Sequence, residues 1–83
     1  MNKDQIGQTV TKFIGKNFLF DETKKVPEND SLLGSGIIDS TGVLELIAFL
    51  EQQYGLKFED NELVAENFDS INNIKSFISK KLG

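Results

Sequence analysis

The sequence reads STGVLELIAFLEQQY over residues 40–54, and this stretch decides the fold of the chain. Its apolar residues recur at the three- and four-residue spacing of an amphipathic helix, which predicts a helix over 40–54. Asp39 or Ser40 can cap its start, because a side-chain oxygen there accepts a free backbone N–H, and Gly55 suits its end. The expected apolar stripe contains Val43, Leu44, Ile47, Leu50 and Tyr54, widened by Leu46 and Phe49.

Comparable spacing predicts one long helix on each side of this segment. The helix expected over 3–18 has Ile6, Val10, Phe13 and Ile14 on one face. The helix expected over 71–82, with Asp69 or Ser70 as its cap, has Ile71, Ile74, Ile78 and Leu82. A short helix or turn is expected near 62–68. No segment shows the strict alternation of a half-buried strand, so the sequence predicts an all-α fold, a small up-and-down-like four-helix bundle with three longer helices and one short one. The chain is expected to form a single domain over residues 1–83.

Residues 19–38 predict a long loop between the first two helices. Pro27 breaks any helix there, and turn-forming Ser and Gly residues follow it. Leu19 and Phe20 are expected to anchor the start of the loop in the core. The apolar residues within it, Leu32, Leu33, Ile37 and Ile38, indicate that the loop is held against the core. Loops of this length tend to be functional or disordered.

The composition excludes several kinds of chemistry. The chain has no Cys and no His, so it lacks a thiolate nucleophile, the commonest general base and the commonest transition-metal ligand. Residues 1–5 lack the apolar run of a signal peptide, and no apolar stretch approaches the roughly 18 residues of a membrane span. A cytoplasmic location is therefore expected, and the chain is also expected to be a monomer.

The negative charge is concentrated in the middle of the chain. The net charge is −4, but residues 39–69 contain eight acidic residues and a single lysine, Lys57. Such a segment repels nucleic acid and favours partners with basic surfaces. The alternative reading is that these acids form ordinary solvated helix faces.

The most informative motif is Gly36-Ile37-Ile38-Asp39-Ser40-Thr41-Gly42-Val43-Leu44-Glu45-Leu46-Ile47, which places Asp-Ser where a loop joins a helix. This motif resembles the modification site of acyl carrier proteins, in which Asp-Ser opens the second helix. The resemblance continues through Ala48-Phe49-Leu50-Glu51-Gln52-Gln53-Tyr54-Gly55 and extends to the length of the chain and the order of its helices. It thus covers nearly the whole chain, although only about twenty residues are diagnostic.

The resemblance implies that Ser40 receives 4′-phosphopantetheine from coenzyme A, and that Asp39 caps the helix and contributes to recognition by the transferase. A phosphopantetheinyl transferase, with Mg²⁺ on its own side, would form the phosphodiester at Ser40 Oγ. The arm ends in a thiol that holds an acyl group as a thioester, which supplies the thiol that a chain without cysteine lacks. The helix start suits this role, because unpaired N–H groups and the helix dipole favour a negative phosphate.

Two positions depart from the family pattern. Thr41 stands where the family usually has Leu or Met, at a position that commonly meets partner enzymes. Gly42 lowers helix propensity and is expected to allow close approach of a partner or of the arm. Together with a second helix that has fewer acids than the typical carrier, these departures suggest a specialised or secondary-pathway carrier.

The remaining candidate sites concern partners and cargo. Acyl-loading and acyl-transfer enzymes with basic docking surfaces are the expected partners, bound weakly and in a salt-sensitive manner. The candidate docking residues are Thr41, Glu45, Glu51, Glu62 and Glu66. The candidate acyl pocket is lined by Leu44, Ile47, Leu50, Leu63, Val64, Phe68 and Ile74, although the same residues also suit a plain core. The acids near residue 60 lack the spacing of a calcium loop, so no metal site is predicted.

The sequence is compatible with three functions. The first is an acyl carrier that shuttles thioesters between enzymes of fatty-acid, lipid or secondary-metabolite biosynthesis. The second is an aminoacyl or peptidyl carrier of a synthetase pathway. The third is an unmodified helical interaction module in which Ser40 is only a cap. An independent enzyme is not expected, because the carboxylates show no paired arrangement for acid–base work.

Overall fold

The computed structural model describes residues 3–21 and 26–83 of the chain. Within these ranges four α-helices follow one another: α1 Lys3–Phe18, α2 Ser40–Tyr54, α3 Ala65–Phe68 and α4 Ile71–Leu82. A single turn of 3-10 helix, η1 Asp60–Glu62, precedes α3. The same residues contain no strand, and the predicted all-α fold with three longer helices and one short helix is confirmed. None of the helices in these two ranges has the length and apolar content needed to cross a membrane.

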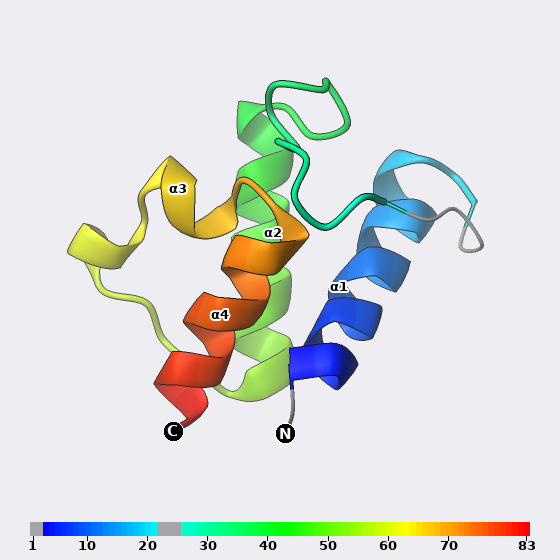
Figure 1. Ribbon diagram of the computed structural model, residues 1–83. Coiled ribbons are helices and arrows are strands. Elements are labelled where there is room, and N and C mark those ends of the chain that lie inside the picture. The colour runs from blue at the N-terminus through cyan, green and yellow to red at the C-terminus, as the bar shows by residue number, and fades with distance from the viewer. Residues whose placement is uncertain (1–2, 22–25) are drawn as a thin grey trace.

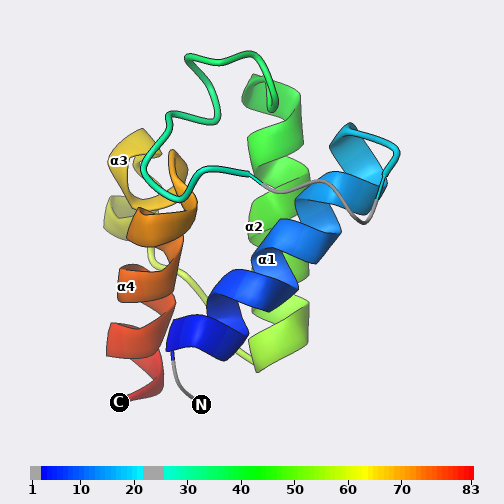
Figure 2. The same cartoon turned by 45° about the vertical axis from the view of Figure 1, so that its right-hand side comes forward.

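The three longer helices surround one hydrophobic core. α4 packs against both α1 and α3, and α2 lies on the far side of α4 in the view of Figure 1. α1 begins and α4 ends at the same end of the bundle (Figures 1 and 2). The described part of the long loop crosses the opposite end, where α2 begins. The site at residue 40 therefore lies at the end of the bundle that this loop covers.

The buried faces of α1 and α4 are those that the apolar spacing predicts, with two exceptions: Leu82, the last residue of α4, is 38% exposed, and Phe13 is only partly buried. Ile6, Val10 and Ile14 of α1, and Ile71, Ile74 and Ile78 of α4, have no exposed surface. The face of α2 differs from the prediction, because Leu46 and Leu50 are fully buried whereas Leu44 is 66% exposed. Residues two apart on a helix point about 200° apart, so Leu44 and Leu46 cannot both face the core. Leu46 marks the centre of the buried stripe.

The long loop is held against the core, as its apolar residues predict. Val26, Leu32 and Ile38 are buried within the same cluster as the helices. Residues 22–25 of the predicted loop lie outside the described residues. The expectation that Phe20 anchors the loop is wrong, because its side chain is 88% exposed. Its backbone turns into the left-handed region with φ of 57°, which directs the ring away from the core at the end of α1.

Candidate functional site

The first turn of α2 is capped by Asp39 rather than by Ser40. Asp39 has extended backbone angles, and its Oδ1 accepts the backbone N–H of Gly42 at 2.7 Å. This bond satisfies one of the backbone donors that the first turn of a helix leaves unpaired. Ser40 is consequently the first helical residue, and it is exposed to solvent. The start of α2 therefore presents a hydroxyl that is not needed as the cap.

The glycine two residues further on lets the chain pack closely against itself. Gly42 is buried, and a Cβ built there would lie 2.8 Å from Cε1 of Phe18 and 2.9 Å from Cγ2 of Ile38. Real Cβ atoms do not approach other atoms this closely, so a larger residue would displace one of these neighbours. The groups that approach Gly42 are thus the end of α1 and the residue before the cap, both from this chain.

Asp69 fastens the loop to the junction of α3 and α4. Its two carboxylate oxygens accept the hydroxyl of Ser31 at 2.9 and 2.8 Å, and one of them also accepts the backbone N–H of Leu33 at 3.0 Å. Ser70 caps α4, accepting the backbone N–H of Asn73 at 3.1 Å. Of the two predicted caps, Ser70 fills that role, and the carboxylate of Asp69 binds the loop instead.

A second attachment lies nearer the start of the described loop. Nζ of Lys75, a buried lysine, contacts Oε2 of Glu28 at 2.9 Å. The backbone N–H of Asn72 donates to the carbonyl of Glu28 at 2.9 Å, and its side-chain amide donates to Asn29 at 2.7 Å. These contacts join the loop to the first turns of α4. The segment that leads into α2 is therefore held in place by α4.

An apolar pocket of about 200 Å³ opens beside Ser40, between α2 and the segment that contains α3. Ser40 is the only residue with a polar side chain among those that line it. The others are Leu33, Val43, Ile47, Leu63, Val64, Ala65 and Phe68. Four of the residues expected to shelter an acyl chain, Ile47, Leu63, Val64 and Phe68, are thus brought together here.

Three other expected pocket residues lie elsewhere. Leu50 and Ile74 are fully buried in the core and do not line this pocket, and Leu44 is exposed to solvent. Three residues that line the pocket were not predicted from the sequence, namely Leu33, Val43 and Ala65. Val43 follows Ser40 by three residues and so shares its side of the helix, a signal that the sequence contains. The backbone of Leu33 is bound by Asp69, a contact over 36 residues that no local pattern reveals.

Two of the five candidate docking residues are engaged within the molecule. Oε2 of Glu51 accepts the backbone N–H of Phe58 at 3.0 Å. Glu62 forms an ion pair with Lys81, with 2.8 Å between Oε1 and Nζ, and it also accepts the backbone N–H of Glu59. The hydrogen bond from Lys81, with that from Glu59, lowers the pKa of the Glu62 carboxyl. Both acids therefore hold the segment between α2 and α4 in place.

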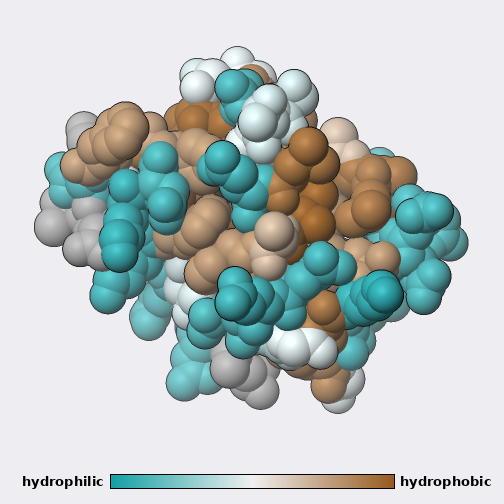
Figure 3. Space-filling view, turned by 180° about the vertical axis from the view of Figure 1, so that it is seen from behind, coloured by the Kyte–Doolittle hydropathy of each residue, from teal (hydrophilic) through white to brown (hydrophobic). Residues whose placement is uncertain are grey.

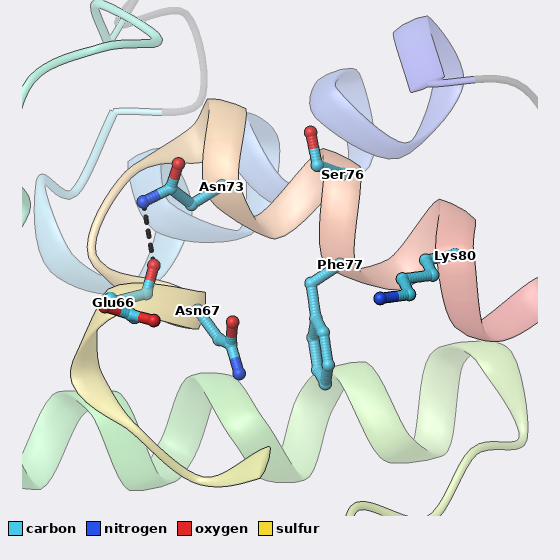
Figure 4. A pocket seen from close by; sticks show the side chains of 6 residues that line it. All are labelled: Glu66, Asn67, Asn73, Ser76, Phe77 and Lys80. Atoms are coloured by element: carbon cyan, nitrogen blue, oxygen red, sulfur yellow. Dashed lines mark hydrogen bonds between the residues drawn. The ribbon is translucent and has the colours of Figure 1, made fainter.

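The other three candidate docking residues are exposed. Thr41 and Glu45 line a hollow of about 270 Å³ with Asp39 and Phe18. Glu66 lies at a separate hollow of about 420 Å³ between α3 and α4 (Figure 4), where the side-chain amide of Asn73 donates to its backbone carbonyl at 2.7 Å. Figure 3 shows that apolar side chains also reach the surface among polar ones, on the face turned away in Figure 1. In residues 3–21 and 26–83, no three potential carboxylate ligands come together as a metal-binding group.

The architecture is that of a small helical protein with an exposed serine at the start of its second helix, next to an apolar pocket. No protein-family profile matches the chain. The chain is, however, 29% identical over 82 residues to the acyl carrier protein of Thermotoga maritima, a match that spans 99% of this chain and 98% of that protein. This full-length similarity, together with the fold, supports the assignment of the chain to the acyl carrier protein family, as the sequence predicts. It also supports a carrier role in general terms.

Proposed function

We propose that this chain holds acyl intermediates as thioesters on a 4′-phosphopantetheine arm attached to Ser40, and passes them between enzymes of fatty-acid, lipid or secondary-metabolite biosynthesis. The observation that carries the proposal is the exposed Ser40 at the first position of α2, beside an apolar pocket. The named relative supports the same role, because its similarity covers the whole chain.

The residues at the start of α2 suit a phosphodiester. Ser40 offers an exposed hydroxyl, and the neighbouring backbone N–H groups and helix dipole favour a phosphate there. Asp39 fixes the first turn and contributes to recognition by the phosphopantetheinyl transferase, which takes the group from coenzyme A. When bound, the group supplies a thiol that carries the acyl cargo. The chain's own part is to present Ser40 and shelter the cargo, and catalysis belongs to its partners.

The partners are enzymes with basic docking surfaces that load or receive the acyl group. Glu45 and Glu66 are the acids best placed to meet them, since Glu51 and Glu62 have internal partners. Exposed ion pairs of this kind are weak and screened by salt, as suits a carrier that must dissociate after each transfer. We infer a monomer that acts in the cytoplasm.

The test is an intact-mass measurement after incubation with coenzyme A and a broad-specificity phosphopantetheinyl transferase. We expect the mass to rise by one phosphopantetheine. Ser40→Ala should abolish the addition, whereas Ser76→Ala, which removes another exposed hydroxyl, should not. A wild-type protein that stays unmodified beside a modified control carrier would contradict the proposal and favour a helical interaction module.

A further inference from the structure

The pocket beside Ser40 has a floor that limits its depth. Phe68 lines the pocket yet is almost completely buried, so its ring forms the inner end of the space rather than its rim. Behind this ring stand two further aromatic rings, those of Phe58 and Phe77, each with its centroid 5.5 Å from that of Phe68. Phe58 and Phe77 are themselves 5.4 Å apart. A chain entering beside Ser40 therefore meets a packed aromatic cluster.

The same cluster separates the pocket from the hollow on the other side of α3. Phe77 lines that second hollow, together with Asn67 and Lys80 (Figure 4). Its ring points from α4 toward α2 and meets the ring of Phe68 edge-on. The two spaces are thus divided by this pair of rings, and an acyl chain cannot extend from one into the other while both rings stay in place.

The size of the pocket sets the length of cargo that it can shelter. An apolar cavity of about 150 Å³ accommodates benzene, which has six carbons. On that scale the 200 Å³ beside Ser40 accommodates about eight carbon-sized atoms, which is the number of carbons in an octanoyl group. Interiors are close-packed, so deeper insertion would displace a ring of the aromatic cluster.

The chemistry of the lining sets the kind of cargo. Apart from Ser40, every side chain that lines the pocket is apolar. An α-ammonium group, as on an aminoacyl cargo, would lose its hydration there without gaining a charged or hydrogen-bonding partner, which is unfavourable. Methylene groups would gain stabilisation by leaving water.

We infer that this carrier shelters short, uncharged aliphatic acyl groups of about eight carbons or fewer, and that Phe68 determines this limit. This inference rests on the proposed function. Longer chains reach the aromatic floor before their thioester has entered the pocket, so the thioester remains in solvent. Aminoacyl groups of the same length remain outside because of their charge.

The test compares how fast hydroxylamine cleaves the thioester for a series of cargoes. Each is loaded by the transferase, which moves the whole acyl-phosphopantetheine from the corresponding acyl-coenzyme A to Ser40 Oγ and releases adenosine 3′,5′-bisphosphate. The series contains butyryl, octanoyl, dodecanoyl and hexadecanoyl groups, with 2-aminobutyryl as the charged match for butyryl. Each rate is divided by that of the same thioester on free coenzyme A, which removes intrinsic differences in reactivity. We expect protection on the order of tenfold for octanoyl, clear protection for butyryl, and almost none for hexadecanoyl or 2-aminobutyryl.

Two variants examine the role of the floor. Phe68→Leu shortens the side chain and should move the greatest protection toward dodecanoyl. Phe49→Leu makes the same change on the side of α2 that stacks on Phe13 at 4.0 Å, away from this pocket, and should leave the length profile unchanged. If Phe68→Leu fails to fold, as judged by circular dichroism, the wild-type series still decides the length limit.

Protection that persists or increases through hexadecanoyl would overturn the length limit, and equal protection of butyryl and 2-aminobutyryl would overturn the exclusion of charge. A folded Phe68→Leu variant with an unchanged profile would overturn the role of Phe68. A failure of the proposed function gives a different result, because the intact-mass measurement would then show no arm on Ser40. That result would overturn both the proposed function and this inference.

Discussion

The contact between Asp69 and Ser31 should be among the strongest single polar contributions to the stability of this fold. The Asp69 carboxylate accepts the Ser31 hydroxyl and the Leu33 N–H, at distances from 2.8 to 3.0 Å. Hydrogen bonds to a charged group contribute about 1.5–3 kcal/mol each, and partial exposure places these near the lower value. Asp69→Ala should therefore lower the free energy of unfolding by about 3 kcal/mol, a large share of the stability of a small domain.

A double-mutant cycle isolates the pair from other effects of each substitution. Ser31→Ala also removes the acceptor of the Gly34 N–H, which lies 2.8 Å from Oγ, so its own loss should be about 2 kcal/mol. The double variant should lose less than the sum of the two, by about 1.5 kcal/mol. Asp30→Ala, at an exposed acid in the same loop, should change stability by no more than about 0.5 kcal/mol.

Urea unfolding followed by far-UV circular dichroism measures these differences in the free energy of unfolding. The comparison requires that the slope of this free energy against urea concentration is the same among the variants. Additive effects of the two substitutions, with a coupling below about 0.5 kcal/mol, would refute the reasoning. So would an Asp69→Ala variant as stable as Asp30→Ala, because the loop would then be held by its apolar residues alone.

Three further predictions concern the ends of the helices. Gly42→Ala should destabilise the protein by about 1 kcal/mol, because overpacking of about 1–3 kcal/mol exceeds the gain of about 1 kcal/mol in helix propensity; a melting temperature at or above that of the wild type would contradict this. Asp39→Ala should lower the free energy of unfolding, measured by thermal unfolding, by about 1 kcal/mol, whereas Asp39→Asn should retain most of the stabilisation that the cap provides. Because the folded-state pKa of Glu62 is lowered, its contribution to stability is present above its ordinary pKa and is lost as the pH falls through the folded value. Lys81→Met should flatten the decline in the urea midpoint between about pH 5 and pH 3, and an unchanged slope would argue against the pair.

The helices could be predicted from sequence because their signals are local. In α1 and α4 the apolar residues recur at helical spacing, and most of the side chains that this spacing selects are fully buried, although Leu82 at the end of α4 is 38% exposed. Gly55 ends α2 in the left-handed conformation that glycine adopts most readily. Such features involve residues within four positions of one another, so a single sequence contains all the information they require.

Features that depend on distant residues could not be predicted in the same way. The sequence shows Glu51 and Glu62 only as acids, and it does not reveal that one binds the backbone of Phe58 and the other pairs with Lys81. Phe20 illustrates the reverse case, because an apolar ring suggests burial but the left-handed backbone turns it into solvent. The sequence predicts only some of the residues that line the pocket for the same reason, because Leu33 enters the pocket through a loop that Asp69 binds.

The accessibility of Ser40 follows from a competition that local sequence leaves open. Serine and aspartate cap helices almost equally well, so either residue of the Asp-Ser pair can fill that position. If Ser40 were the cap, its Oγ would accept a backbone N–H and point back along the helix. The capping position instead falls to Asp39, whose neighbour Ile38 is buried and donates its N–H to the carbonyl of Leu32 at 3.1 Å. Because Leu32 is itself buried and bound to the backbone of Asp69, contacts made by a distant turn fix where α2 begins. The hydroxyl is thereby left exposed at the start of α2, which is where the proposed function requires it.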